Sequence, residues 1–175
     1  AEFDFAKSLA NGRLIVDNSA CWGNYHLKTD INDYHTYWAI PENHQKFSET
    51  VQEVADRPRW LFSPYGDAEE TGQEVLMISE FGNWGLPRLP EKLPFWFDRQ
   101  FLDNLVTLPE GVIQRFNDYQ YGRMFKNYNE LAEFSQKAQA QVLKWEIEEI
   151  RLQPELQGYV ITEFTDINWE CNGLL

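Results

Sequence analysis

The chain has 175 residues, enough for a domain with a substantial core. Its formal net charge of −13 argues against nucleic acid or an anionic membrane surface as a partner, because phosphate binding needs clustered Lys and Arg. Aromatic residues make up 15% of the chain, which suits either a large core or a site where rings stack on sugars.

The first third of the chain predicts a helix, two strands and a second helix. Residues 2–9 are amphipathic, and Asn11-Gly12 suits a helix C-terminus. Residues 13–17 (RLIVD) predict a buried strand, and residues 29–38 predict a second one that is less apolar. Apolar residues at i, i+4 and i+7 then predict a helix that begins at Pro41 and ends near residue 56.

The middle of the chain holds the most apolar strand. Residues 60–63 predict a short extra strand, and an acidic loop follows at 66–72. Residues 75–78 (VLMI) suit a strand buried on both faces, with Glu80 at its end. Three prolines make 86–94 an extended loop.

The last part of the chain predicts helices and one more strand. Residues 95–105 and 110–126 are typical of helices, and Asn129 suits the N-cap of a long helix to about residue 152. The apolar stripe predicted for that helix is Leu131, Phe134, Ala138, Val142 and Trp145. Residues 158–164 (GYVITEF) predict the fourth strand.

Alternating buried strands and amphipathic helices predict one α/β domain with parallel strands. In such folds the functional groups lie at the carboxyl ends of the strands. Polar, acidic and aromatic residues follow all four predicted strands. They are Asp17-Asn18-Ser19 after the first, Asp33, His35 and Tyr37 at the second, Glu80 at the third, and Glu163, Asp166, Asn168 and Trp169 at the fourth.

This ordered set resembles glycoside hydrolase family 2, which includes β-galactosidases, β-glucuronidases and β-mannosidases. The motifs are Asp17-Asn18-Ser19, Thr29-Asp30-Ile31, Asp33-Tyr34-His35-Thr36-Tyr37, Ser79-Glu80-Phe81-Gly82, Gln141 to Arg151, and Gly158-Tyr159-Val160-Ile161-Thr162 through Asp166. The resemblance covers nearly the whole chain. It implies the last four strands, with their helices, of a catalytic TIM (β/α)8 barrel, with a long helical insertion at about residues 86–127.

The resemblance also implies a retaining mechanism in which Glu80 is the nucleophile and Tyr37 orients its carboxylate. The alternative for Tyr37 is an aromatic core residue, and for His35 a packed histidine at a strand end. Thr162 stands where the family usually has a tryptophan. The predicted substrate-binding residues are His35, Asp33, Trp84, Glu163, Asp166 and Trp169. For Glu163 and Asp166 the alternative is structural bonding to loop amides.

A retaining glycosidase needs a second carboxylic acid about 5–5.5 Å from the nucleophile. In the family this Glu follows an Asn at the end of the fourth barrel strand. The only candidate pair here, Asn129-Glu130, lies at a predicted helix start, and both ends of the chain look cut. We therefore expect a fragment that carries the nucleophile without the general acid/base and is inactive alone. It would pair with the missing barrel half or with a copy of itself.

Two other functions stay open at this stage. The first is a non-catalytic carbohydrate-binding or interaction module with a glycosidase-like fold. The second is a hydrolase using Asp17, His35 and Ser19 or Ser79, which is disfavoured because no G-x-S-x-G motif is present. No cofactor is predicted. A metal site is disfavoured because the three histidines show no H-x-x-x-H spacing.

The sequence leaves the redox state of Cys21 and Cys171 and the compartment open, since two cysteines make no disulfide framework. No apolar run has the length of a transmembrane helix, and no signal peptide is visible.

Overall fold

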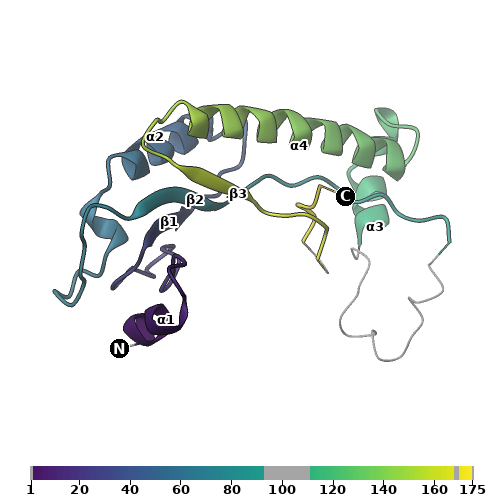
Figure 1. Ribbon diagram of the computed structural model, residues 1–175. Helices are drawn as coiled ribbons and strands as arrows, with labels where there is room; N and C mark the ends of the chain where they lie inside the picture. Colours follow the sequence, from purple (N-terminus) through teal and green to yellow (C-terminus); the bar gives the residue numbers. More distant parts are fainter. Residues whose placement is uncertain (1, 93–110, 168–169, 175) are drawn as a thin grey trace. The chain divides into compact units, whose positions relative to one another are not determined.

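The computed structural model describes residues 2–92, 111–167 and 170–174 (Figure 1). The chain divides into two compact units. The first consists of residues 1–81 and 144–161, and the second of residues 82–143 and 162–175. We describe each unit by itself.

The first unit contains a parallel sheet of three strands. They are β1 (Ile31–His35), β2 (Val75–Phe81) and β3 (Gly158–Ile161), in the order β1-β2-β3. Leu76 and Ile78 of β2 are fully buried, as expected for the most apolar segment of the chain. The predicted α/β class with parallel strands is therefore confirmed.

A bulge in β2 decides where Glu80 points. Tyr34 of β1 pairs with Ile78, but the next residue, His35, pairs with Glu80, so Ser79 is an extra residue in the ladder. Without the bulge, strict alternation would place Glu80 on the buried face with Ile78. The extra residue instead places Glu80 on the opposite face, beside His35, and returns Phe81 to the buried side.

Two helices belong wholly to the first unit, α1 (Glu2–Leu9) and α2 (His44–Ala55). The predicted apolar stripe of α2 is confirmed, because Phe47, Val51 and Val54 are fully buried. The Phe47 ring packs against Trp145 in the last turns of α4, with 5.5 Å between ring centroids. Figure 1 shows α2 and this end of α4 on one side of the sheet. However, α2 begins at His44 rather than at Pro41.

The predicted strand at residues 13–17 is not formed. Asp30 donates its N–H to the Ile15 carbonyl at 2.9 Å, but the Ile15 N–H is taken by the Asp30 carboxylate at 2.7 Å. The Asp30 side chain thus occupies the Ile15 N–H, which in a strand would bond to the backbone of a neighbouring strand. The segment next bridges to β1 only at Ala20, which pairs with Tyr34. Leu14 and Val16, which would share one face of a strand, are about half exposed, so that face is not covered.

The extra strand predicted at residues 60–63 is also wrong. Arg59–Leu61 form a 3-10 helix, η1, and Phe62 makes a single parallel bridge with His26. The amide of Ser63 donates to the His26 carbonyl at 2.9 Å. This stretch therefore encloses His26 instead of extending the sheet.

The second unit is built around α4 (Tyr128–Arg151), whose last turns belong to the first unit. Its other helices are α3 (Val112–Asp118) and the 3-10 helix η2 (Tyr121–Arg123). Helix 110–126 was predicted as continuous, but Gln120 adopts a left-handed conformation (φ 56°) that separates α3 from η2. The helix predicted at 95–105 lies outside the described residues. Residues 86–90 carry no regular structure, as the prolines predict.

The buried face of α4 differs from the predicted stripe. Phe134 is 61% exposed, whereas Gln139 and Glu146 are buried. The cap also differs, because the amide of Glu130 bonds to the Asn127 side chain at 3.0 Å. The Asn129 side chain instead accepts a hydrogen bond from the Leu89 amide and donates one to the Leu89 carbonyl. Gln139 lies inward because its side chain binds the backbone of the loop after β2 and of residues 172–173.

That loop is held along its length by side chains of α4. The amide of Leu86 donates to Ser135, and its carbonyl accepts from Gln136. The Gln139 amide group donates to the carbonyls of Asn83, Asn172 and Gly173 at 2.9–3.3 Å. Gly85 leaves room for this side chain, because a Cβ at this position would overlap Oε1 of Gln139 and displace it. The contacts fix residues 83–89 without regular secondary structure.

We predict that Phe47→Ala destabilises the first unit by about 3–5 kcal/mol, because it removes a fully buried ring from the contact with Trp145. Urea unfolding followed by tryptophan fluorescence measures the effect. The matched control is Phe5→Ala, since Phe5 is 68% exposed and should lose little stability. Equal losses in both variants would contradict the packing described here.

Candidate functional site

Three predicted site residues come together at the carboxyl ends of β1 and β2. The Tyr37 hydroxyl donates a hydrogen bond of 3.0 Å to Glu80 Oε2. His35 Nδ1 lies 3.3 Å from the same oxygen. The backbone joins them as well, since the amide of Thr36 donates to the Glu80 carbonyl at 2.9 Å. The predicted cluster of Tyr37, His35 and Glu80 is therefore present in the structure.

The Glu80 carboxylate is held on one side and open on the other. Its side chain is 40% exposed, and that of His35 is 15% exposed. Both contacts fall on Oε2; among the described residues, no hydrogen bond reaches Oε1. A carboxylate with one oxygen oriented and the other accessible can act as a nucleophile or accept a hydrogen bond from a ligand hydroxyl.

Asp33 faces the same side of the sheet but is 1% exposed. Its Oδ2 accepts a hydrogen bond from the hydroxyl of Ser79, the extra residue of the bulge. Its other carboxylate oxygen lies 3.5 Å from His26 Nε2. Its carboxylate is therefore buried and engaged by other residues of the first unit, and its role toward a substrate stays a prediction.

His26 is fully buried between two carboxylates, and sequence reasoning missed this role. Its Nδ1 lies 2.8 Å from Asp17 Oδ1 and its Nε2 lies 3.1 Å from the Asp33 carbonyl. The Asp33 N–H also points at Nε2, at 3.1 Å. A charged imidazole donates from both nitrogens, whereas a neutral one donates from Nδ1 and accepts this N–H. No sequence pattern marks the residue, because its partners lie 9 and 7 positions away.

The Asp17–His26 pair favours both charged forms. Burial alone would raise the pKa of Asp17 above 3.8, but hydrogen bonds from His26 and from the Leu27 and Lys28 amides outweigh it and lower the pKa to about 2. Burial alone would lower the pKa of His26, but the hydrogen bonds to Asp17 and to the Asp33 carbonyl, helped by both carboxylate charges, raise it above 6.5. The pair is thus a buried salt bridge that supports β1.

The remaining predicted substrate ligands belong to the second unit or lie outside the described residues. Trp84 is 49% exposed. Asp166 accepts a hydrogen bond of 2.9 Å from the Gly173 amide, which is the structural role that was its alternative. The Glu163 amide donates to the Asn172 carbonyl at 3.2 Å. Trp169 lies outside the described residues. The roles of these side chains toward a substrate stay predictions.

Other sequence-based hypotheses receive no support from the geometry. Asp17 binds His26 rather than His35, so no Asp-His-Ser arrangement forms with it. Across residues 2–92, 111–167 and 170–174, no three His, Cys, Asp or Glu side chains gather into a metal-binding group. Cys21 and Cys171 are both free thiols. No described helix combines the length and apolarity that a membrane crossing requires.

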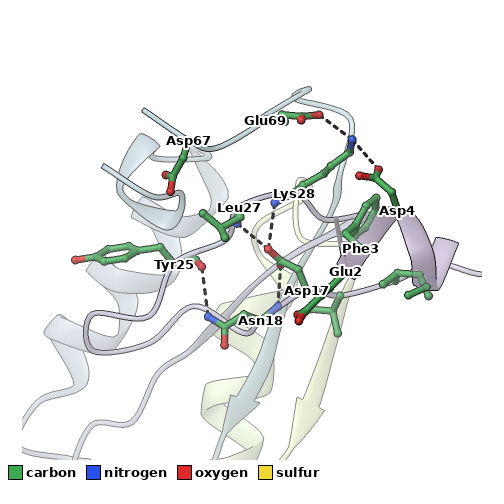
Figure 2. A pocket seen from close by; sticks show the side chains of 13 residues that line it. Glu2, Phe3, Asp4, Asp17, Asn18, Tyr25, Leu27, Lys28, Asp67 and Glu69 are labelled. Carbon is green, nitrogen blue, oxygen red and sulfur yellow. Dashed lines mark hydrogen bonds and ion pairs between the residues drawn. The ribbon is translucent and has the colours of Figure 1, made fainter. Parts of the chain in front are cut away.

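A separate pocket of about 760 Å³ lies between α1 and the loops around residues 15–18, 25–28 and 67–69 (Figure 2). Its lysine pairs with two of its carboxylates. The Lys28 ammonium lies 2.9 Å from both Asp4 and Glu69, and Asp17 accepts the amides of Leu27 and Lys28. The pocket lining does not include the Glu80 cluster. We therefore assign these contacts to the docking of α1.

Comparison with known proteins finds no match for the chain among protein-family models, curated proteins or solved structures. The family resemblance of the sequence therefore stays a prediction.

We predict that the free energy of unfolding is highest between about pH 4 and 6.5. Because its pKa is lowered, Asp17 contributes fully to the free energy of unfolding above pH 3.8. This contribution is lost as the pH falls through about 2. Because its pKa is raised, His26 contributes fully to the free energy of unfolding below pH 6.5. This contribution is lost as the pH rises through the pKa of His26 in the folded state. Urea unfolding of the wild type at a series of pH values measures both arms.

Asp17→Asn should lower the free energy of unfolding by about 2 kcal/mol at pH 5. It should also flatten the pH dependence on the acid and the alkaline side, since it removes the charge that holds His26 protonated. Glu42→Gln is the control, because Glu42 is exposed and should leave the profile unchanged. A variant Asp17→Asn with the pH dependence of the wild type would refute this account of the buried pair.

Proposed function

We propose that this chain is part of a retaining glycoside hydrolase acting on β-glycosides, with Glu80 as the nucleophile. The observation that carries the proposal is the hydrogen bond of 3.0 Å from the Tyr37 hydroxyl to Glu80 Oε2. The two contacts of Tyr37 and His35 on one carboxylate oxygen fix the direction of the Glu80 side chain. The parallel strands and the position of all three residues at strand carboxyl ends support the same reading.

In the proposed reaction the Glu80 carboxylate attacks the anomeric carbon of the sugar. A bond forms between that carbon and Oε1, while the bond to the leaving-group oxygen breaks and its electron pair goes to that oxygen. Water then cleaves the glycosyl ester and releases the sugar with the same anomeric configuration. His35, partly exposed beside Glu80, is placed to bind a sugar hydroxyl.

The leaving group needs a proton from a second carboxylic acid, and we assign this role to no residue of this chain. The sheet is proposed to be part of the second half of a TIM barrel, and the acid to come from the other half. Strand β3 is an outer strand of the three-stranded sheet and can pair with a further strand, whereas the outer edge of β1 is bonded to the segment around Ala20. The other barrel half, or a second copy of the chain, would complete the barrel.

We predict that a 2-deoxy-2-fluoroglycosyl fluoride labels Glu80 covalently. Fluoride leaves without a proton, so this step does not require the general acid, and the fluorine at C2 slows hydrolysis of the ester. The chain is incubated with the β-glucosyl, β-galactosyl, β-mannosyl and β-glucuronyl reagents. Mass spectrometry of the intact chain and of its peptides then locates the label.

Glu80→Gln should abolish the label, whereas Glu49→Gln is the matched control that keeps it, since Glu49 is an exposed carboxylate on α2 and no predicted site residue. The same chain should turn over ordinary β-glycosides very slowly, since general acid catalysis contributes roughly 10²–10⁴-fold. Sugar binding by the wild type without any label would instead favour the alternative of a non-catalytic carbohydrate-binding module.

We further predict that Tyr37→Phe slows labelling of Glu80 about tenfold or more. A hydrogen bond to a charged group is worth about 1.5–3 kcal/mol, and here it orients the attacking carboxylate. The rate constant of inactivation at saturating reagent measures the effect. Tyr65→Phe serves as the control, because Tyr65 is 84% exposed. An unchanged rate in Tyr37→Phe would remove Tyr37 from the site.

A further inference from the structure

Trp22 is the most exposed tryptophan of the described residues, with 79% of its surface accessible, and it lies beside the Glu80 cluster. Its ring stacks on that of Tyr37, with 6.4 Å between centroids and 24° between planes. The hydroxyl of the same Tyr37 bonds to Glu80. One aromatic surface therefore continues from the carboxylate into solvent. The sequence showed this loop as polar and aromatic, but Trp22 was not among the predicted ligands.

The turn that carries Trp22 is fixed to the sheet. The Asn24 amide donates to the Cys21 carbonyl at 2.7 Å, which closes a tight turn with Trp22 and Gly23 at its centre. Just before the turn, Ala20 donates to the Asp33 carbonyl and accepts from the His35 amide at 3.1 Å. The turn is thus bonded to the strand that bears His35, so Trp22 keeps its place relative to the site.

The backbone at Trp22 is unusual for a large side chain. Trp22 has φ +38° and Gly23 has φ +98°, so both central residues of the turn are left-handed. Such turns favour Asn or Gly at the first of these positions, and a tryptophan there is strained. An exposed, strained tryptophan beside a reactive carboxylate indicates a functional constraint rather than a packing one.

We infer that Trp22 is a stacking platform for a sugar ring of the ligand bound at Glu80. The C–H groups on one face of a pyranose are apolar and weakly positive, and they pack on the electron-rich face of an indole. The ring face that Tyr37 leaves open is accessible to such a ligand. This inference rests on the proposed function, and it adds a binding residue that acts on affinity rather than on the chemical step.

The test compares inactivation by 2-deoxy-2-fluoro-β-glucosyl and β-galactosyl fluorides in the wild type, Trp22→Ala, Trp22→Phe and Tyr65→Ala. Trp22→Ala should raise the half-saturating reagent concentration roughly tenfold, the size of one aromatic contact, without changing the maximal rate. Trp22→Phe should recover part of the affinity. Tyr65→Ala should match the wild type, because Tyr65 is equally exposed in a separate loop.

Unchanged saturation in Trp22→Ala, with the wild type labelled at Glu80, would overturn the platform and leave the proposed function intact. A fall in the maximal rate at unchanged saturation would also overturn it, since Trp22 would then act only by positioning Tyr37. If the wild type is not labelled, the proposed function fails. Binding of methyl β-glucoside and β-galactoside, followed by ligand-observed NMR, then decides. Binding by the wild type that is lost in Trp22→Ala supports the platform. No binding by the wild type, or equal binding by Trp22→Ala, overturns it.

Discussion

The geometry of the site depends on one extra residue in β2. Ser79 breaks the alternation of the strand, and its hydroxyl is held by the buried carboxylate of Asp33. Asp33 is held in turn by His26, and His26 by Asp17. The aim of the Glu80 side chain is therefore set by a buried polar network and not by apolar packing.

The second unit uses a different device to order irregular backbone. A loop without helix or strand leaves peptide groups that need hydrogen-bond partners. Here α4 supplies them from Asn129, Ser135, Gln136 and Gln139, and these polar side chains stand beside buried apolar residues such as Ala132 and Leu143. The loop can then stay extended and ordered although it contains no helix or strand.

Hydrophobic patterning predicted the parallel sheet, α2 and the extent of α4, because these elements bury apolar residues at regular spacing. It failed where polar groups decide the structure. The strand at residues 13–17 is absent because the Asp30 carboxylate takes the amide of Ile15. The stripe on α4 differs because Gln139 bonds to backbone carbonyls. The pairing of His35, Tyr37 and Glu80 was predictable from their places at strand ends, whereas the bulge that aims Glu80 was not.

The two oxygens of Glu80 are not equivalent, because Tyr37 and His35 both contact Oε2. In the proposed ester, Oε1 is the atom bonded to sugar and Oε2 remains as the carbonyl. The Tyr37 hydroxyl then faces an oxygen that has lost most of its negative charge, so its hydrogen bond weakens when the ester forms and regains strength when the ester is cleaved. Under the proposed function, this asymmetry favours release of the carboxylate over persistence of the intermediate.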